Sequence, residues 1–466
     1  MASPVAPLAS RPAAGTASMA RVVLATAFGF VVVQLDVTIV NVALARIGAD
    51  LGTSVTGLQW VVDAYTLAFA AAMLSAGIIG DLLGARRAYL GGLALFVAAS
   101  LACGAAPSLP LLIAARAVQG LGAALVIPNS LALLNHAAAG DRQRRARAVG
   151  FWTAAGGVAI ATGPVAGGLL QQAFGWRSIF YLNLPLGLVG ALLTLLWVPR
   201  PAPADDGRQL DPLGQLWSIL ALTGVTGALI EAGPLGLAHP LVAGGFVLSI
   251  VAALAFARNE ARAAAPTLPP ALFRHSIFNG GVVFGALVNL TYYGILFVLS
   301  LYLQNILAYS PLQAGFAYLP LTGTFIASNI ASGSLAARVG SRLPMISGAL
   351  LGAAGFALLL ALDAHSSYAA MLLPFVLIPA GIGFAVPAMT ASVLGCIEPS
   401  AAGTAMAVLN TARQAGGAVG VALFGALAHD AGIVAGLHAA ALISALALSA
   451  ASGLAAYVNR PLLARS

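Results

Sequence analysis

Three charged side chains lie inside stretches of sequence that are long and apolar enough to cross a membrane. Arg116 lies in the stretch from 109 to 134, which reads LPLLIAARAVQGLGAALVIPNSLALL. Asp36 and Asp63 lie in the two apolar stretches nearest the N-terminus. At 1.5 Å per residue, Asp36 and Arg116 both lie roughly 10–12 Å below the outer ends of their stretches, and Asp63 lies in the same layer. A charge is costly in hydrocarbon, so each of these needs a partner or a function.

An aspartate beside an arginine can bind and release protons under conformational control. Burial favours the neutral acid, whereas a nearby guanidinium favours the carboxylate. If a conformational change or a substrate displaces the arginine, the aspartate therefore changes its affinity for protons. We predict Asp36, Arg116 and Asp63 as proton-coupling residues. The alternative is a static buried ion pair that only fixes packing, and for Asp63 both interpretations stay open.

The composition is that of a membrane protein built from helices. The chain has 466 residues, of which 60% are hydrophobic and 7% are charged, whereas a soluble protein would carry roughly 25% charged residues. Apolar segments of helical length cover nearly all of the chain, and the alternating pattern of barrel strands is absent. We expect an all-α integral membrane protein.

We count fourteen transmembrane helices. All 21 basic residues are arginine, and they gather in alternate loops, so the positive-inside rule places both termini in the cytoplasm. The same distribution accounts for the net charge of +8 without any nucleic-acid partner. The expected spans are 21–44, 57–79, 87–106, 109–136, 146–170, 178–198, 213–232, 240–258, 278–306, 315–337, 342–362, 368–395, 401–428 and 434–458.

An internal repeat divides the spans into two six-helix bundles. The matched pairs, each 256 residues apart, are Gly77 and Gly333, Gly84 and Gly340, and Arg86 and Arg342. Parallel six-helix halves with a site between them at mid-membrane are a transporter architecture. The expected domains are a disordered cytoplasmic tail at 1–20, an N-terminal bundle at 21–200, two inserted helices with their linkers at 201–275, a C-terminal bundle at 276–460 and a cytoplasmic tail at 461–466.

The loop after the second span carries a recognisable motif. Residues 77–87 read GIIGDLLGARR, which resembles the G-x-x-x-D-x-x-G-x-R-R loop of the major facilitator superfamily. The glycines would allow close helix approach and a tight turn, and the aspartate would cap the N-terminal end of the thirteenth span near 400–403. The alternative is a basic loop that only sets orientation. The candidate gating residues here are Gly77, Asp81, Gly84, Arg86 and Arg87.

Two further segments resemble one branch of that superfamily, the fourteen-span drug:proton antiporters of the EmrB/QacA type. Residues 35–44 read LDVTIVNVAL, which is similar to the span-1 motif of these antiporters. Arg116 opens an R-x-x-Q-G pattern that resembles their span 4. The resemblance implies that this arginine takes part in proton coupling, with Gln119 beside it.

The fifth span resembles the antiporter motif of the same branch. Residues 156–168 read GGVAIATGPVAGG, and the match rests on Gly163, Pro164, Gly167 and Gly168. We expect the proline to kink the helix and the glycines to present a flat face to the other half. The resemblance implies exchange of substrates rather than symport.

The repeat also suggests where a substrate would bind. The position that matches Asp36 in the second half is Tyr292. We therefore predict that the first half handles protons, while aromatic rings of the second half contact planar or cationic substrates. Ordinary core tyrosines are the alternative. The candidate substrate-binding residues are Asn289, Tyr292, Tyr293, Gln119 and Arg413.

These patterns together predict a proton-coupled antiporter of the major facilitator fold in the bacterial inner membrane. It would export small lipophilic or cationic molecules, such as drugs or antibiotics, by alternating access and would draw on the proton gradient without a cofactor. We expect no enzymatic activity, no metal site and no ATP drive. The alternatives are an exporter of one specific metabolite and a proton-coupled importer on the same fold. Substrate identity and any periplasmic adaptor are left open.

Overall fold

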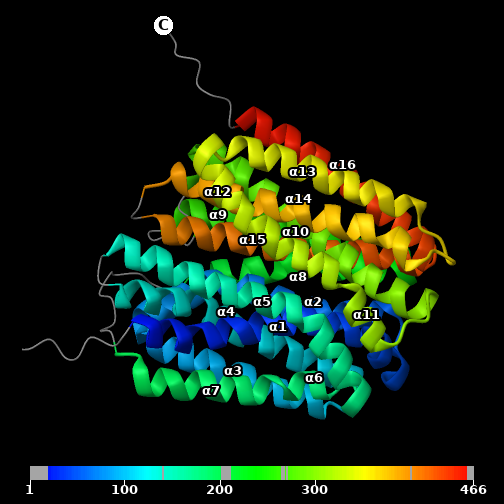
Figure 1. Ribbon diagram of the computed structural model, residues 1–466, viewed down its shortest axis with the longest axis horizontal. Coiled ribbons are helices and arrows are strands. Elements are labelled where there is room, and N and C mark those ends of the chain that lie inside the picture. Colours follow the sequence, from blue (N-terminus) through cyan, green and yellow to red (C-terminus); the bar gives the residue numbers. More distant parts are fainter. Residues whose placement is uncertain are drawn as a thin grey trace, which may run out of the picture.

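The long helices of this protein run roughly parallel to one another (Figure 1). The computed structural model describes residues 19–138, 141–200, 211–263, 268, 271–398 and 401–458. Every regular element within these ranges is helical, which confirms the all-α fold class. The expected tails at 1–20 and 461–466 lie outside the described residues, except that the first helix already begins at Met19.

The first half consists of the helices that precede the inserted pair. They are α1 (Met19–Leu51), α2 (Val55–Leu83), α3 (Ala85–Ala105), α4 (Leu109–Ala137), α5 (Arg142–Phe174), α6 (Ser178–Tyr181) and α7 (Asn183–Trp197). The sixth expected span is thus divided into a short helix and a longer one. Helix α5 is capped by Asp141, whose carboxylate accepts hydrogen bonds from the backbone N–H groups of Gln143 and Arg144. Helix α2 is bent by 56° between Met73 and Ser75.

The remaining helices form the inserted pair and the second half. The pair is α8 (Pro212–Leu235) and α9 (Pro240–Arg262), and the second half is η1 (Leu272–Arg274), α10 (Ser276–Leu301), η2 (Tyr302–Ile306), α11 (Pro311–Ala317), α12 (Leu319–Val339), α13 (Arg342–Leu358), η3 (Leu359–Ala361), α14 (Tyr368–Gly395), α15 (Ala402–Asp430) and α16 (Ile433–Val458). Helix α8 packs against α9, against α2 of the first half and against α15 of the second.

The number of helices that could cross a membrane by length and hydropathy is smaller than the expected number of spans. Within the described residues eleven helices qualify, or twelve if the bent α2 counts as one span. Helices α12 and α15 are not among them; α15 carries Arg413 and many small residues, and α12 carries several hydroxyl groups. The structure therefore shows a multi-pass membrane protein, and fourteen spans with both termini in the cytoplasm remain a prediction.

Equivalent contacts recur in the two halves. Arg86 at the start of α3 donates a hydrogen bond of 2.8 Å to the Leu195 carbonyl near the end of α7. In the second half, Arg342 at the start of α13 donates one of 3.1 Å to the Ala456 carbonyl near the end of α16. Gly84 and Gly340, which precede these arginines, have φ values of +86° and +78°, a conformation that disfavours any residue with a Cβ. These contacts agree with the predicted repeat.

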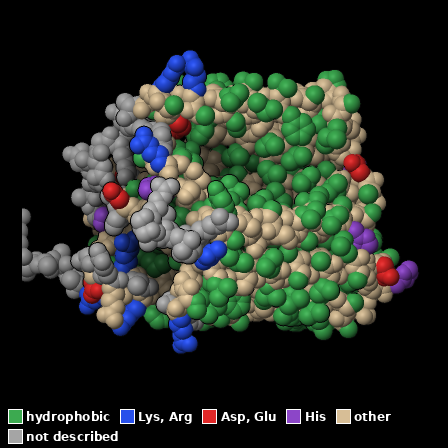
Figure 2. Space-filling view, turned by 90° about the horizontal axis from the view of Figure 1, so that it is seen from above, with side chains coloured by type: hydrophobic (Ala, Val, Ile, Leu, Met, Phe, Trp, Pro, Cys, Tyr) green, Lys and Arg blue, Asp and Glu red, His purple; other side chains and the backbone are tan. Residues whose placement is uncertain are grey.

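The charges gather at the ends of the molecule and leave an apolar side surface between them (Figure 2). Most of the arginines visible on this face lie at one end, and the broad middle of the surface is covered by hydrophobic side chains. Many of the exposed large residues on α7 and α9 are leucine and valine. A surface of this kind would be an aggregation hazard in water but is suited to contact with lipid.

The two halves are packed tightly against each other at one end of the helices. Gln59 near the start of α2 donates a hydrogen bond of 2.6 Å to the Ala422 carbonyl of α15. Ser300 of α10 donates to the Asn41 carbonyl of α1, and Gly168 of α5 lies against the backbone of Pro311. In α15, the part from 416 to 428 is mostly buried, whereas the part from 402 to 415 is mostly only half-buried. The molecule is therefore closed at the end where α1 finishes and α2 begins.

Candidate functional site

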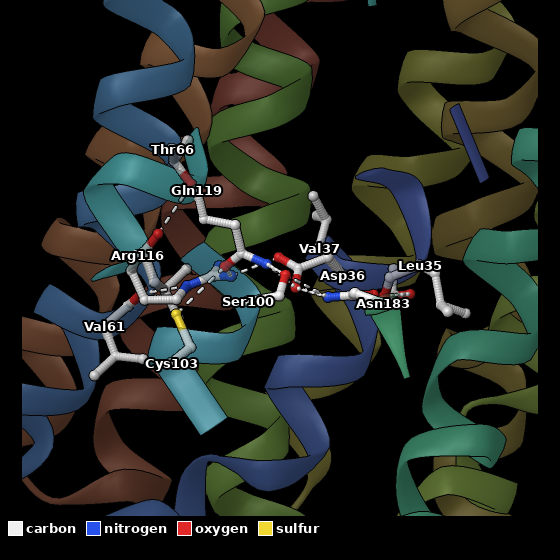
Figure 3. A network of polar contacts seen from close by, with 12 residues as sticks. Leu35, Asp36, Val37, Val61, Thr66, Ser100, Cys103, Arg116, Gln119 and Asn183 are labelled. Atoms are coloured by element: carbon white, nitrogen blue, oxygen red, sulfur yellow. Dashed lines mark hydrogen bonds and ion pairs between the residues drawn. The ribbon is translucent and has the colours of Figure 1, made fainter. Parts of the chain in front are cut away.

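A buried ion pair lies in the first half of the molecule (Figure 3). The Arg116 Nη1 of α4 and the Asp36 Oδ2 of α1 are 2.5 Å apart, and the two side chains are 2% and 0% exposed. The structure thus brings together the two residues that the sequence predicts as partners. Removing either side chain alone would leave its partner as an uncompensated charge in a dry interior, which is strongly destabilising.

The second carboxylate oxygen of Asp36 is held by two amide side chains. Gln119 and Asn183 each donate a hydrogen bond of 2.9 Å to Asp36 Oδ1. Both amides also donate to the hydroxyl of Ser100, at 2.8 and 3.3 Å. The carboxylate therefore has a donor on each oxygen, and its negative charge is stabilised by hydrogen bonds as well as by the guanidinium.

Asn183 and Ser100 were not among the predicted site residues. Both are fully buried polar side chains in otherwise apolar helices, α7 and α3. For Asn183 the available signal was a polar residue within the apolar segment IFYLNLPLG. A serine in an alanine-rich helix carries a weaker signal, because it often bonds only to its own backbone.

Arg116 is fixed in place by further contacts. Its Nε donates to the Val61 carbonyl of α2 at 3.1 Å, and its Nη1 donates to Gln119 Oε1 at 2.6 Å. The guanidinium carbon lies 4.3 Å from the centre of the Tyr65 ring, within range of a cation–π interaction. The planar, five-donor guanidinium can make these contacts at the same time, which a lysine ammonium could not do.

Asp63 does not join this network. It is fully buried, and neither of its carboxylate oxygens has a hydrogen-bond partner in the described part of the chain. On α2, the Val61 carbonyl accepts a hydrogen bond from Arg116. Asp63 is two residues further along this helix and therefore faces roughly the opposite side. Asp63 therefore makes no contact with the Asp36–Arg116 pair, and its predicted role in proton coupling stays a prediction.

A small cavity lies between the two halves, directly beside the ion pair. Tyr65, Thr66 and Arg116 line it from the first half, and Tyr293, Gln414 and Gly417 line it from the second. Arg116 thus contacts the Asp36 carboxylate on one side and lines the cavity on the other. The cavity has a volume of only about 20 Å³ in this conformation, and its lining combines aromatic faces, amide and hydroxyl groups and one cation.

The predicted substrate residues of the second half divide into two groups. Tyr293 lines the cavity, whereas Tyr292 is 7% exposed and stacks on Phe325 with ring centres 5.9 Å apart. Arg413 donates to Asn289 Oδ1 at 3.3 Å, so these two predicted residues contact each other. Gln119, also predicted to contact substrate, directs its hydrogen bonds into the Asp36 network. Contact with substrate remains a prediction for all of them.

The loop motif is partly as expected. Gly84 alone separates α2 from α3 and makes the tight turn, Arg86 is buried against α7, and Arg87 is exposed. The close approach expected at Gly77 is wrong, because a Cβ there would have nothing within 4 Å; it occurs at Gly80, where a Cβ would lie 1.8 Å from Asn129 Oδ1. The expected contact of Asp81 with the start of the thirteenth span near 400–403 stays a prediction, and residue 400 of that range lies outside the described residues.

The span-5 motif faces both halves rather than one. A Cβ on Gly168 would lie 2.7 Å from the Pro311 carbonyl oxygen of α11, and one on Gly315 would lie 2.5 Å from the Pro164 carbonyl oxygen, so these positions do join the halves. Gly163 and Gly167 instead lie against Thr38 and Ile39 of α1. The prediction that all the glycines face the other half is therefore wrong for these two, which pack α5 against its own bundle.

Comparison with known proteins places this architecture in a family. Residues 26–421, and in a second overlapping match residues 282–463, match the sequence profile of the Major Facilitator Superfamily. The chain belongs to the major facilitator superfamily. This major facilitator is 38% identical over 408 residues to the methylenomycin A resistance protein of Streptomyces coelicolor, covering 88% of the chain and 85% of the relative.

Other relatives of this major facilitator carry similar names. It is 39% identical to the puromycin resistance protein of Streptomyces alboniger, over 84% of the chain and 78% of that protein. It is 35% identical to the multidrug resistance protein Stp of Mycobacterium tuberculosis, over 87% and 75%. Among solved structures, the human organic anion transporter MFSD10 (TETRAN) superposes with a TM-score of 0.61 at 18% identity, covering 92% of this chain and 98% of that one, which shows a shared fold.

Proposed function

We propose that this major facilitator is a proton-coupled antiporter of the fourteen-span branch, which exports small lipophilic or cationic molecules such as drugs or antibiotics. The resistance and export functions named for its relatives support the choice of cargo. It would work in the bacterial inner membrane, with the proton gradient as its energy source and without a cofactor.

The observation that carries this proposal is the position of Arg116 between Asp36 and the cavity. The guanidinium holds the carboxylate at 2.5 Å and also lines the space between the halves. A substrate that enters the cavity and attracts the guanidinium weakens its hold on Asp36, and a proton on Asp36 in turn frees the guanidinium. Proton and substrate therefore compete through one side chain, which is what antiport requires.

The conformation of the halves fits one stage of such a cycle. The contacts of Gln59, Asn41 and Gly168 close the end that we assign to the periplasm. The half-buried first part of α15 lies toward the other end. We assign this to the inward-facing stage, in which Arg116 pairs with Asp36 and substrate would enter from the cytoplasm or the inner leaflet. Rocking of the halves would then expose the pair to the acidic outside, where Asp36 takes up a proton.

The test is proton flux in energised inverted membrane vesicles, challenged with a panel of lipophilic and cationic drugs. An exported compound should collapse the pH gradient in the wild type and leave it unchanged in Asp36→Asn. Asp50→Asn is the matched control, because Asp50 lies on the same helix but pairs with Arg46 near the surface at 3.1 Å. Equal responses in the wild type and Asp36→Asn would overturn the proposal.

A narrower cargo is the second candidate. The relatives include proteins named for resistance to single antibiotics, methylenomycin A and puromycin. A folded protein that responds to none of a broad panel but to one compound of the producing cell would be a specific exporter. Substrate-driven flux in the opposite direction would instead identify an importer on the same fold.

A further inference from the structure

Helix α2 is bent by 56° between Met73 and Ser75, although the sequence of this helix favours a straight one. The helix contains no proline, and the residues from 70 to 72, just before the bend, are all alanine, the strongest helix former. Sharp bends without proline often arise where a side chain from elsewhere inserts into the hydrogen-bond ladder of the helix. The neighbouring helices must therefore hold α2 in its bent form.

The side-chain amide of Gln215, on the inserted helix α8, bridges the bend. Its Nε2 donates a hydrogen bond of 2.7 Å to the Ala71 carbonyl, before the bend, and its Oε1 accepts a hydrogen bond from the Ser75 hydroxyl, after the bend. In a straight helix the Ala71 carbonyl would accept a hydrogen bond from the backbone N–H of Ser75, four residues further on. Gln215 therefore supplies this carbonyl with a donor when the bend opens the helix at that point.

A second amide holds α2 on another side, beyond the bend. Asn129 of α4 donates a hydrogen bond of 3.2 Å to the Ala76 carbonyl of α2. Ala71 and Ala76 are five residues apart and therefore lie roughly 140° apart around the helix. Amide groups from α8 and α4 thus hold the bend from two sides. Because these are side-chain hydrogen bonds and not a covalent constraint such as a proline, the bend can be reversed.

Gln215 is itself held in place at the start of α8. The Asp211 carboxylate caps this helix by accepting a hydrogen bond of 2.9 Å from the Gly214 N–H, and its other oxygen accepts one of 2.5 Å from Asn259 of α9. The Asp211 carbonyl also accepts a hydrogen bond of 2.9 Å from the backbone N–H of Gln215. The start of α8 is therefore fastened to α9, and Gln215 is a fixed point against which α2 bends.

The part of α2 beyond the bend leads to the loop motif at the inner end, which we assign to the cytoplasm. This part, Ser75–Leu83, is about 13 Å long, and straightening the bend would move its far end by roughly 12 Å. The first part of α2 is attached to the outer end of α8 by the 3.0 Å hydrogen bond from Trp60 to Glu231. A change in the bend therefore acts mainly on the inner end of the molecule.

We propose that α8 controls the conformation of α2, with Gln215 as a positioning residue that holds α2 bent while the inner end is open. When the halves rock to close the inner end, Ala71 and Ser75 leave Gln215 and α2 straightens. The assignment of the bent form to the inward-facing stage rests on the proposed function, whereas the coupling of Gln215 to the two ends of the molecule does not. The inserted pair then acts as a fixed support for the moving part of the first half.

The first measurement is hydrogen–deuterium exchange of the purified protein in lipid nanodiscs, without substrate or a proton gradient, read by mass spectrometry. In Gln215→Leu, exchange in the segments that close the outer end, 54–62 and 296–304, should rise roughly three- to tenfold, because the bent form loses its hydrogen bonds. Exchange in 402–415, near the inner end, should fall as this end closes. A rise at both ends would show that Gln215 only stabilises the fold and would overturn the proposal, as would no change at either end.

Ser218→Ala is the matched control for this measurement. Ser218 lies on the same helix, and its hydroxyl donates a hydrogen bond of 2.9 Å to the Gln215 carbonyl of that helix, so its loss should change exchange at neither end. Ser75→Ala removes one of the two bonds across the bend and should give the Gln215→Leu pattern with a smaller rise, about two- to threefold. A Ser75→Ala variant with wild-type exchange at both ends would contradict the proposal.

A rescue variant tests the bend itself. A proline at position 75 removes the backbone donor to the Ala71 carbonyl and bends the helix there without help from α8. Ser75→Pro in the Gln215→Leu background should therefore return exchange at both ends toward the wild-type values. If the folded double variant keeps the Gln215→Leu pattern, the bend does not control the two ends and the proposal fails.

Transport measurements separate this proposal from the proposed antiport. In inverted vesicles, Gln215→Leu should raise the half-saturating substrate concentration roughly threefold, because the form that binds cytoplasmic substrate is less populated. If Asp36→Asn transports normally while the opposite exchange changes in Gln215→Leu persist, the antiport mechanism fails and the control of α2 by α8 stands. If Asp36→Asn abolishes export while Gln215→Leu exchanges like the wild type, the antiport stands and the present proposal fails.

Discussion

Asn183 donates a hydrogen bond of 2.9 Å to Asp36, although the two residues are 147 positions apart in the chain. The bond ties α7 to α1 at the carboxylate that Arg116 of α4 also holds. Three helices of the first half therefore meet at one acid, and their relative positions are linked to its charge. A change in the protonation of Asp36 alters the contacts that hold these helices together.

Asn183→Leu should destabilise the protein by about 1–3 kcal/mol, because a buried charged acceptor loses a donor. Gln171→Leu is the matched control. Gln171 is also a buried amide, but its side chain has no hydrogen-bond partner among the described residues, so leucine there should be neutral or stabilising. Thermal unfolding of the two variants in the same detergent checks this. Equal losses of stability would show that the Asn183 hydrogen bond does not stabilise the fold.

Sequence alone predicted the two charged partners but not the residues that complete their site. Asp36 and Arg116 stand out because charges in apolar helices are rare and their depths agree. Asn183 could not be placed, because its contact depends on how α7 rotates against α1 and α3. The lack of contact between Asp63 and the pair could not be predicted for the same reason, since the depth of a residue along a helix can be counted in the sequence but the direction it faces cannot.

The glycines illustrate the same limit. At Gly84 and Gly340 the requirement is local, a positive φ at a one-residue turn or helix end, and the repeat in the sequence predicted it. At Gly77 and Gly163 the requirement depends on which helix lies opposite, and the predicted contacts were wrong. Local backbone geometry is encoded in neighbouring residues, whereas helix facing is set by packing across the whole bundle.

The ion pair should show strong energetic coupling between its members. Arg116→Gln leaves Asp36 buried without its cation, and we expect a loss of about 3–5 kcal/mol. Asp36→Asn combined with Arg116→Gln should recover much of that stability, because no charge is left, yet it should not restore export. A double-mutant cycle by thermal unfolding, with flux measured in parallel, tests this; additive losses would mean that the two side chains do not stabilise each other.

The two adjacent tyrosines of α10 should behave differently. Tyr293 lines the cavity, so Tyr293→Ala should weaken substrate binding by about tenfold through loss of an aromatic contact. Tyr292 packs on Phe325, so Tyr292→Ala should cost mainly stability, about 3–5 kcal/mol as for other buried aromatic truncations. Drug binding to purified protein and thermal unfolding separate the two effects. A substrate-specific loss in Tyr292→Ala with normal stability would show that the wrong ring was assigned to the site.

Closure of the outer end should depend on Gly168 far more than on Gly77. A Cβ at Gly168 would lie 2.7 Å from the Pro311 carbonyl oxygen and 2.8 Å from the Leu312 Cα, both backbone atoms that cannot move aside cheaply. Gly168→Ala should therefore hold the halves apart at this end, reduce export and cost about 1–3 kcal/mol. Gly77→Ala meets nothing within 4 Å and replaces a helical glycine, so it should be neutral or stabilising by up to about 1 kcal/mol. Export assays and thermal unfolding of both variants decide the matter. If Gly77→Ala abolishes export while the protein stays folded, Gly77 makes its close contact in another state of the transport cycle.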